Sequence, residues 1–378
     1  MPNKKKTYTF IDLFAGAGGL SCGLEQAGFT PCFVNEIVET YCNTYKANHD
    51  LEEDQYFVGD INELNERIHE FSRYITNATL VCGGPPCQGF SMANRQRIID
   101  DPRNQLYKAY LVFLKHVRPK FFIMENVKGM AAKIDEIKQD FKEYLGDEYQ
   151  FDYELLKAQD YGVPQNRERL IFIGNRIGVE PSLIFDEIHK LKRPAFVLRD
   201  ALYGLPQLGA KTEKGKTDIE CEQSGFTVCD FDYPDTEFYH FINGDKVVTR
   251  LYNHKNRYNN QRDIEIFRRL PQGANSLHES IADIMPYKSR NNVFKDKYFK
   301  LSEDQVCKTI TAHMKFDCNM YIHPWEARGL SPREAARIQT FPDDYVFTGA
   351  QNQWYAQIGN AVPVKLARAI GEAIMKFL

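Results

Sequence analysis

The sequence lacks the patterns of a disulfide-rich, zinc-binding or membrane protein. Its nine cysteines are an odd number spread over 378 residues, and no CxxC pair occurs. We therefore expect a reducing, cytoplasmic environment, with neither a disulfide framework nor a metal site. The longest uncharged stretch, 74–94, contains Pro85, Pro86 and three glycines, which excludes a transmembrane helix. No apolar run follows the lysines at 4–6, so we expect no signal peptide.

The sequence also lacks a large excess of charge of one sign, and it contains no internal repeat. The chain has 48 basic and 51 acidic side chains, which gives a formal net charge of −3. The whole chain is therefore no polycation, and any surface for nucleic acid must be local. Hydrophobic residues make up 43% and charged residues 26%, which is ordinary globular usage and excludes wholesale disorder. The length predicts two or three domains, or one large domain with an insertion.

The first half of the chain alternates short apolar runs with amphipathic stretches. The runs predict strands at 7–14, 30–36, 56–58, 80–82, 120–125, 153–158 and 169–174, and the amphipathic stretches predict helices at 20–27 and 105–116. This alternation predicts an α/β fold, with helices on both faces of a parallel sheet. The short sequences FAGAGG, NE, GD, GGPPCQ and MEN each end a predicted strand, at the edge where such folds bind ligands.

The composition changes after about residue 175. Residues 217–245 carry eight acidic side chains and no Lys or Arg, whereas 246–300 carry twelve basic and five acidic side chains. Helical periodicity returns at 331–340 and 363–377. We interpret this order as a nucleotide-binding α/β domain that is interrupted by a different module and completed by C-terminal helices.

The glycine-rich turn at 15–19 follows a strand and precedes a helix. Glycines let the main chain approach a ligand closely, and Glu36 lies about 20 residues on, where a ribose hydroxyl would be bound. Ser21 stands where the dinucleotide pattern GxGxxG needs its last glycine. A nucleoside cofactor without a pyrophosphate, S-adenosylmethionine, therefore fits better, with Asp60 and Ile61 as candidates to bind the adenine. The alternative is a turn with no ligand.

Three further sequences point to chemistry at the same edge of the sheet. In GGPPCQ at 83–88, two prolines stiffen the loop that carries Cys87. A free cysteine is more often structural, but this loop offers no apolar packing. Glu125 ends an apolar strand, and Arg167 and Arg169 precede another. Each alone could be an ordinary surface residue, whereas together they supply a nucleophile, an acid and a pair of cations around one cleft.

The order of FAGAGG, GGPPCQ, ENV, QNRER and QxxxGNxV resembles the cytosine-C5 DNA methyltransferase family, of the bacterial restriction-modification type. The resemblance covers 10–174 and 328–371. It implies a Rossmann-like, S-adenosylmethionine-dependent methyltransferase domain with a smaller inserted target-recognition domain. We expect the cofactor-binding catalytic domain at 1–183 plus 348–378, and the target-recognition domain at 184–347.

The same resemblance implies a mechanism. The thiolate of Cys87 would add to carbon 6 of a flipped cytosine, which makes carbon 5 nucleophilic enough to take the methyl group. Glu125 would hold ring nitrogen 3 and the exocyclic amine, Arg167 would help to hold the base, and Arg169 would order the loop. The product of the cofactor would be S-adenosylhomocysteine, and no metal is implied.

The family pattern also implies binding residues. It assigns the cofactor to Phe14, Gly16, Gly18, Gly19, Leu20, Glu36, Ile37, Asp60, Ile61, Pro86, Leu106, Asn360, Ala361 and Val362. The polar segment 88–103 would close over double-stranded DNA through Gln88, Ser91, Arg95 and Arg97. The basic run 246–300 would supply phosphate contacts, and the candidates for reading bases are Arg250, Asn253, Arg257, Arg290 and Asn291. We expect a monomer that contacts no membrane and is paired with a restriction endonuclease for the same DNA site.

Four other interpretations compete with this one, and the sequence counts against each of them. A transfer-RNA cytosine methyltransferase would use the same catalytic set, but its Cys-Phe-Thr signature is not apparent. A catalytically inactive family member would have lost Cys87, Glu125 or a cofactor glycine, and all are present. A nicotinamide dehydrogenase would need glycine at position 21 and gives no role to PPCQ. A repair glycosylase would not need the cofactor turn.

Overall fold

The structure, a computed structural model, describes residues 6–86, 106–215, 219–286 and 296–378. The chain forms two compact units. Unit 1 comprises Met1–Tyr161, Arg167–Arg193 and Val362–Leu378, and unit 2 comprises Gly162–Asn166 and Pro194–Ala361. Within the described ranges, no helix has both the length and the apolar character that crossing a membrane requires.

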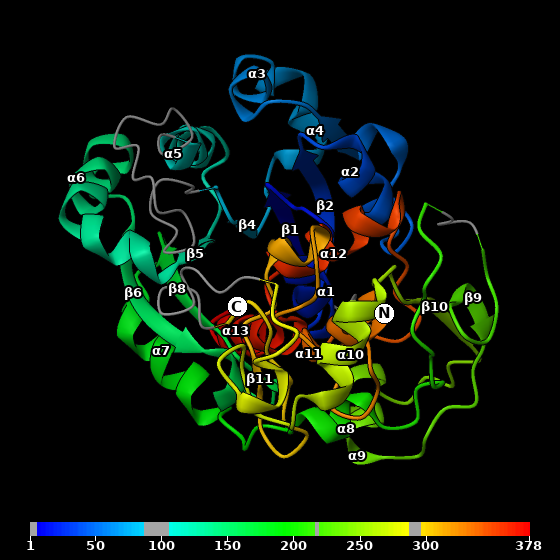
Figure 1. Ribbon diagram of the computed structural model, residues 1–378. Helices are drawn as coiled ribbons and strands as arrows, with labels where there is room; N and C mark the ends of the chain where they lie inside the picture. Colours follow the sequence, from blue (N-terminus) through cyan, green and yellow to red (C-terminus); the bar gives the residue numbers. More distant parts are fainter. Residues whose placement is uncertain (1–5, 87–105, 216–218, 287–295) are drawn as a thin grey trace. The chain divides into compact units, whose positions relative to one another are not determined.

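Unit 1 is built on a seven-stranded sheet in the order β3-β2-β1-β4-β5-β8-β6 (Figure 1). Its strands are β1 (Tyr8–Leu13), β2 (Phe29–Glu36), β3 (Tyr56–Val58), β4 (Leu80–Gly83), β5 (Phe121–Val127), β6 (Gln150–Lys157) and β8 (Glu168–Asn175). All seven strands expected from the apolar runs are present, and their ends shift by at most three residues.

One strand departs from the expected topology. Strands β1 to β5 run parallel, but β8 runs antiparallel to both β5 and β6. The prediction of a wholly parallel sheet is therefore wrong here. A parallel neighbour needs a long crossover, and only the short helix η6 (Ala158–Asp160) and the two-residue strand β7 (Gln165–Asn166) separate β6 from β8. As a result, the start of β8 lies at the edge where β5 ends, and Arg169 pairs with Val127.

Helices cover both faces of this sheet. On one face, α3 (Ile61–Glu66), α5 (Leu106–Val117) and α6 (Ile134–Leu145) share an apolar core with strand residues such as Val81, Phe122 and Phe172. Figure 1 shows α6 and α7 (Pro181–Lys190) on opposite sides of β6 and β8. Helix α13 (Val364–Met375) packs on α7 and on α1 (Gly19–Gln26). A Cβ on Gly23 would lie only 2.4 Å from Ala367 Cβ, so α1 and α13 need glycine at their contact.

The remaining elements of unit 1 are short. Three of them contact β2, namely α2 (Glu39–Lys46), η1 (Glu53–Gln55) and α4 (Ser72–Ile75), and η2 (Ile68–Phe71) contacts α4. Helix η5 (Lys128–Lys133) contacts β8 and α6.

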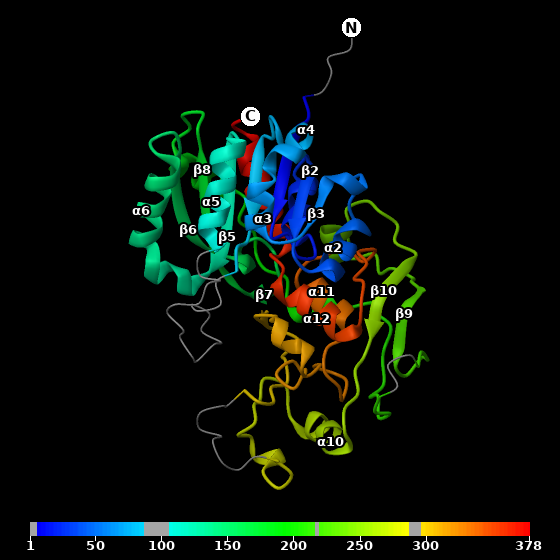
Figure 2. The same cartoon turned by 90° about the horizontal axis from the view of Figure 1, so that it is seen from above.

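Unit 2 contains two small strand pairs and five α-helices among the residues that the structure describes. Strand β7 pairs in parallel with β11 (Cys307–Lys308), and β9 (Gly225–Asp230) pairs antiparallel with β10 (Arg250–Lys255). The helices are α8 (Leu198–Leu202), α9 (Glu237–Asn243), α10 (Gln261–Arg269), α11 (Pro332–Ile338) and α12 (Gln351–Asn360), with η7 (Glu279–Ile281) and η8 (Ala312–Lys315). Figure 2 shows α10 apart from the β9–β10 pair, and each region has its own apolar cluster.

The two units divide the chain differently from the expected domain boundaries. Helix α7 packs on β6 and α13, so residues 184–193 group with unit 1. Helix α12 packs on α11 and η8, so residues 348–361 group with unit 2. The assignment of one unit to the cofactor and the other to target recognition stays a prediction.

Candidate active site

The turn after β1 combines an uncommon backbone with an open surface. Phe14, Gly16 and Gly18 all have positive φ, and for Phe14 this is a conformation that non-glycine residues adopt rarely, often at functional sites. A Cβ on Gly16 would meet no atom within 4 Å, so the main chain there borders open space. The turn can therefore approach a ligand closely.

Glu36, at the end of β2, ties this turn to the sheet. Its carboxylate accepts hydrogen bonds from the N–H of Gly16 at 2.7 Å and from the N–H of Val38 at 2.8 Å. Burial raises the pKa of Glu36, and the N–H donors of Val38 and Gly16 oppose that rise. The predicted cofactor acid thus has a second task, because it fixes the conformation of the glycine turn.

Ser21 replaces glycine for a structural reason. Its hydroxyl donates to the Asp12 carboxylate at 2.5 Å and accepts from the Tyr45 hydroxyl at 2.8 Å, and all three side chains are buried. Burial raises the pKa of Asp12 to about 7, although hydrogen bonds from Ser21 and Cys82 counteract this effect. The departure from the dinucleotide pattern therefore serves a buried polar network beneath the glycine turn. Sequence reasoning missed Asp12 and Tyr45, and the unexpected serine was the signal for them.

Apolar side chains are exposed beside Glu36. Ile37 is 62% exposed, and Val38 and Val58 are exposed as well. Ile61, in contrast, belongs to the core beneath the sheet, while Asp60 caps α3 by accepting from the N–H of Asn62. We therefore keep Ile37, rather than Ile61, as the apolar surface for a flat base. A buried carboxylate next to exposed apolar groups suits a nucleoside, which has hydroxyls at one end and a ring at the other.

The ends of β1, β4 and β5 meet closely. A Cβ on Gly83 would lie 2.6 Å from Leu13 O, and a Cβ on Gly84 would lie 2.9 Å from Glu125 Oε2. Asn126 Nδ2 donates to Pro85 O at 2.9 Å. The turn that leads to Cys87 is thus held against the Glu125–Asn126 segment. Sequence reasoning missed the contribution of Asn126, although its place in the ENV motif marks it.

Arg169 holds the carboxylate of Glu125. Its Nε lies 2.6 Å from Glu125 Oε1, and both side chains are only 12% exposed. Burial lowers the pKa of Arg169, and the charge of Glu125 opposes that change. Arg167, two residues earlier, is buried, and its carbonyl accepts from the N–H of Ala158. The reversed direction of β8 brings Arg169 to this edge of the sheet, since its first residues pair with the last residues of β5.

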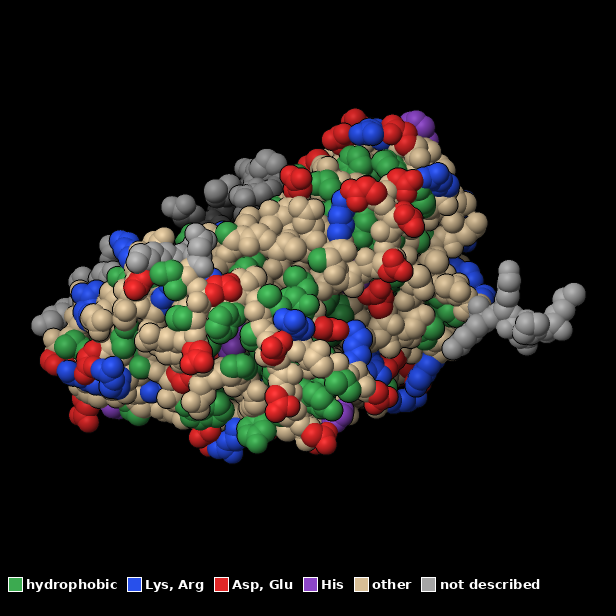
Figure 3. All heavy atoms as spheres, turned by 90° about the vertical axis from the view of Figure 1, so that its right-hand side faces the viewer, with side chains coloured by type: hydrophobic (Ala, Val, Ile, Leu, Met, Phe, Trp, Pro, Cys, Tyr) green, Lys and Arg blue, Asp and Glu red, His purple; other side chains and the backbone are tan. Residues whose placement is uncertain are grey.

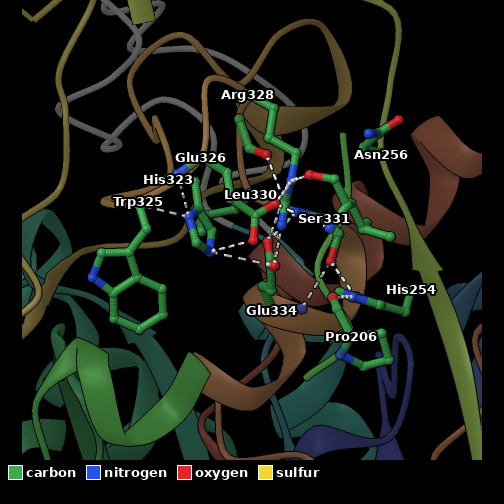
Figure 4. A network of polar contacts seen from close by, with 12 residues as sticks. Pro206, His254, Asn256, His323, Trp325, Glu326, Arg328, Leu330, Ser331 and Glu334 are labelled. Atoms are coloured by element: carbon green, nitrogen blue, oxygen red, sulfur yellow. Dashed lines mark hydrogen bonds and ion pairs between the residues drawn. The ribbon is translucent and has the colours of Figure 1, made fainter. Parts of the chain in front are cut away.

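Unit 2 contains a buried ionic network around α11 (Figure 4). Arg328 binds both carboxylate oxygens of Glu334, at 2.8 and 2.7 Å, and its Nε lies 2.6 Å from Glu326. His323 faces Glu334 at 3.6 Å, and His254 lies 3.0 Å from the hydroxyl of Ser331. Ser331 and Glu334 also form the capping box that begins α11. These contacts fix the segment from Arg328 to the start of α11.

Comparisons with known proteins bear directly on this arrangement. A model of the C-5 cytosine-specific DNA methylase family matches residues 8–376. The chain belongs to this family.

Relatives of the C-5 cytosine-specific DNA methylase family agree over nearly the whole chain. The Type II methyltransferase M1.HphI of Haemophilus parahaemolyticus is 33% identical over 97% of this chain and 87% of its own length. The Type II methyltransferase M.AgeI of Thalassovita gelatinovora is 31% identical over 96% of this chain and 98% of its own.

Solved structures show the same fold. A protein encoded within an Escherichia coli prophage, and assigned as a DNA modification methyltransferase, has a TM-score of 0.76 and 27% identity, covering 98% of this chain and 99% of its own. The S. pombe Dnmt2 methyltransferase shares the fold at 15% identity, with a TM-score of 0.57 over 98% and 99% of the two chains. The predicted family, α/β fold class and enzyme class are therefore confirmed.

Several predicted site residues of this methylase lie outside the residues that the structure describes. They are Cys87, Gln88, Ser91, Arg95, Arg97, Arg290 and Asn291. Pro86 is the last described residue before Cys87, and Leu106 begins α5. Asn360 ends α12, and Gln339 Nε2 donates to the carbonyls of Ile358 and Ala361.

The three described candidates for reading bases differ in their surroundings. Asn253 is buried, and its side-chain amide both donates to Phe347 O and accepts from Phe347 N at 2.9 Å. The guanidinium of Arg257 donates to Met314 O at 2.7 Å and to Phe316 O at 2.8 Å. We therefore retain only Arg250, which is exposed on β10, as a candidate among these three.

Proposed function

We propose that this methylase transfers a methyl group from S-adenosylmethionine to carbon 5 of a flipped cytosine, within a specific short sequence of duplex DNA. The observation that carries the proposal is the contact of the Gly84–Pro85 turn with Glu125, whose carboxylate Arg169 orients. This contact places Gly84, which precedes Cys87 in the sequence, next to the carboxylate of Glu125. Addition to a pyrimidine ring requires a nucleophile and an acid that act on the same base.

In the proposed reaction, the thiolate of Cys87 forms a bond to carbon 6 of the cytosine, and electron density moves to carbon 5. Glu125 holds ring nitrogen 3 and the exocyclic amine, so that the charge that develops on the ring is offset. After the methyl group has joined carbon 5, the carbon 5 proton leaves and the bond to Cys87 breaks, which restores the aromatic ring. Arg167 helps to hold the base, and Arg169 acts through Glu125.

The cofactor site that we propose fits the residues present. Bound S-adenosylmethionine supplies an electrophilic methyl group and leaves as S-adenosylhomocysteine. The open main chain at Gly16, the carboxylate of Glu36 and the exposed side chain of Ile37 match a nucleoside with free hydroxyls. Asn360, Ala361 and Val362 complete this proposed site by resemblance to the family, and no metal takes part.

The biological setting follows from the relatives. M1.HphI and M.AgeI are Type II methyltransferases, so we propose that this chain is a modification enzyme whose DNA site is shared with a restriction endonuclease. Unit 1 would be the cofactor-binding catalytic domain, and unit 2 the target-recognition domain. One flipped base needs one site, so the proposed enzyme acts as a monomer, in the cytoplasm where bacterial DNA lies.

The first test is a methylation map. The chain and its Cys87→Ser variant are expressed in a host that lacks cytosine methylation, and 5-methylcytosine is mapped over the genome by bisulfite sequencing. We expect one short motif to be methylated by the parent and not by the variant. Methylation by both would contradict the role of Cys87, and methylation of RNA alone would favour the transfer-RNA alternative.

A further inference from the structure

Unit 2 buries a chain of two glutamine amides. On the face in Figure 3, charged side chains of both signs mix at the surface, whereas Gln165 and Gln339 are each 0% exposed. Gln165 lies on β7 and Gln339 directly follows α11, and Figure 2 shows β7 and α11 close to α12. A buried amide destabilises a fold unless its N–H and C=O groups are hydrogen-bonded, so the partners of these two side chains show what they hold.

The hydrogen bonds of the two amides run in one direction. The N–H of Ile310 donates to Gln165 Oε1 at 2.7 Å, and Gln165 Nε2 donates to Gln339 Oε1 at 2.9 Å. Gln339 Nε2 then donates to the carbonyls of Ile358 at 2.8 Å and Ala361 at 3.3 Å. Because the first group can only donate and the last two can only accept, both amides have a single orientation. We call this chain of contacts the glutamine relay.

The glutamine relay is closed by a main-chain contact. A Cβ on Gly359, which lies between the two carbonyl acceptors in the sequence, would be 2.2 Å from both Thr311 C and Ala312 N. The segment that supplies the first donor therefore presses on the end of α12 that supplies the last acceptors. Directly after Gln339, Thr340 has a φ of +60°, which is rare for a β-branched residue and occurs where a fold fixes a position. A closed ring of buried contacts resists displacement of any one member.

One end of the glutamine relay lies next to the proposed base site. Asn166 follows Gln165 and is the last residue of unit 2 before Arg167, which is proposed to hold the cytosine. The hydroxyl of Thr309 donates to Asn166 O at 2.5 Å, and β7 pairs with β11 at this point. The main chain that enters Arg167 is therefore fixed by the relay and by the strand pair.

The other end lies next to the proposed cofactor site. Ala361, whose carbonyl accepts from Gln339, is the last residue of unit 2 before Val362. Asn360, Ala361 and Val362 are the residues proposed to complete the cofactor site, and Asn360 is exposed. Two passages of the chain between the units, at 166–167 and 361–362, thus leave unit 2 from one relay.

We propose that Gln339 and Gln165 are positioning residues, and that the glutamine relay couples the cofactor site to the base site. The inference rests on the proposed function. Methyl transfer requires the acceptor carbon and the methyl donor to be held within about 0.5 Å of a productive arrangement. The buried amide of Gln339 would contact neither, and would act by holding the main chain at 360–361 against that at 165–166. Cofactor binding at one end then fixes the other end, so the two ligands share the free-energy cost of ordering the relay.

The coupling is measured in binding, without turnover. Kd of a fluorescent duplex carrying the mapped motif is determined by anisotropy with and without saturating S-adenosylhomocysteine, and the ratio of the two values is the coupling factor. For the parent we expect a factor of about five or more, in the range usual for coupled sites. Gln339→Leu and Gln165→Leu should each bring the factor below about two, because each breaks the relay. The double variant should show the same factor as either single variant, since one relay can be broken only once.

The matched control is Asn243→Leu, which removes another buried amide of unit 2. Asn243 Nδ2 donates to Asp343 Oδ2 at 2.9 Å, and Asn243 Oδ1 accepts from the N–H of Asp343 at 2.8 Å. This variant should unfold at a lower urea concentration but keep the coupling factor of the parent. Thr309→Val is a milder variant for the case that Gln339→Leu does not fold. Loss of its hydrogen bond to Asn166 O should lower the coupling factor at least about twofold.

The outcomes separate the inference from the proposed function. An unchanged coupling factor in folded Gln339→Leu, or in Thr309→Val if Gln339→Leu does not fold, would overturn the inference. A parent without coupling would do the same, and so would a loss in Asn243→Leu as large as that in Gln339→Leu. In each of these cases, methylation of the mapped motif by the parent leaves the proposed function standing. If the parent methylates no DNA motif, the proposed function has failed and the inference fails with it.

Discussion

The guanidinium of Arg169 and the carboxylate of Glu125 form a nearly buried ion pair of 2.6 Å across the antiparallel edge of β5 and β8. The geometry separates two roles. Glu125 also borders Gly84, so it faces the turn that leads to Cys87. Arg169 contacts Glu125 and would act through that carboxylate. Arg169 is thus a positioning residue in the proposed reaction.

Removal of Arg169 should therefore slow the reaction without removing the reactive groups. We expect Arg169→Gln to lower kcat by about tenfold or more, and Glu125→Gln to lower it by about 10²–10⁴-fold, the range for loss of a group that exchanges or holds a proton. Arg169→Lys should recover part of the rate, because a cation remains. KM for S-adenosylmethionine should stay unchanged, and steady-state kinetics on the mapped motif measures both quantities.

Lys128 offers the control for this experiment. It forms an exposed ion pair with Glu168 at 3.0 Å, one residue from Arg169. Exposed pairs contribute about 0–1 kcal/mol, so Lys128→Gln should leave kcat unchanged. An equal loss in Lys128→Gln and Arg169→Gln would mean that the edge of β8, rather than the Glu125 contact, sets the rate.

Glu36 should govern cofactor affinity. Glu36→Ala removes the acceptor for the N–H groups of Gly16 and Val38, so both the ligand contact and the shape of the turn are lost. We expect Kd for S-adenosylhomocysteine, measured by calorimetry, to rise about tenfold or more, as for a hydrogen bond to a charged group. Affinity for the duplex should change far less. The neighbouring exposed acid provides the control, since Glu39→Ala should bind like the parent.

Asp12 should make unit 1 less stable as pH rises. Its folded-state pKa of about 7 lies above the ordinary 3.8 of an unfolded chain. Between about pH 4 and 7 the folded state keeps a proton that the unfolded chain has released, so the free energy of unfolding falls by about 1.4 kcal/mol per pH unit. Asp12→Asn should lose this slope, and its stability relative to the parent should rise with pH in urea titrations. Parallel curves for the two proteins would contradict a raised pKa.

Two buried histidines should make unit 2 sensitive to acid. Burial lowers the pKa of His254 to about 4 and that of His323 to about 3, against an ordinary value of 6.5. As pH falls below 6.5, the unfolded chain takes up protons that the folded state refuses. Each histidine should therefore cost about 1.4 kcal/mol per pH unit down to about pH 4. His323→Asn should shrink the difference between urea midpoints at pH 7.5 and pH 5, and the exposed His240→Asn should not.

Much of unit 1 could be predicted from the sequence, because its strands are continuous apolar runs and its motifs sit at their ends. The glycine turn and Glu36 could be predicted for the same reason, because both depend on contacts between neighbouring strands. The direction of β8 could not be predicted from apolar periodicity, which is the same for parallel and antiparallel strands. Only the short connection through η6 indicates that β8 is antiparallel.

Unit 2 was harder to predict, because its stability depends on buried polar contacts that lack a periodic signal. Asn253 and Arg257 were predicted to recognise bases because they lie in a basic, Asn-rich segment. Their side chains instead donate hydrogen bonds to main-chain carbonyls, Asn253 to Phe347 and Arg257 to the turn at 314–316. The helix α12 was missed because its six consecutive buried residues, 354–359, include polar Gln357 as well as Gly359 and form no apolar stripe of helical period.

The close contact of α1 with α13 at Gly23 has a consequence for biosynthesis. Helix α1 leaves the ribosome long before its partner α13, and the whole of 194–361 emerges between them. Unit 2 can therefore complete its fold while the apolar side of α1 is still uncovered. The joining of Tyr8 to Leu378 through a hydroxyl–carbonyl contact then closes a loop of 370 residues, so unit 1 should mature late and depend most on protection from aggregation during synthesis.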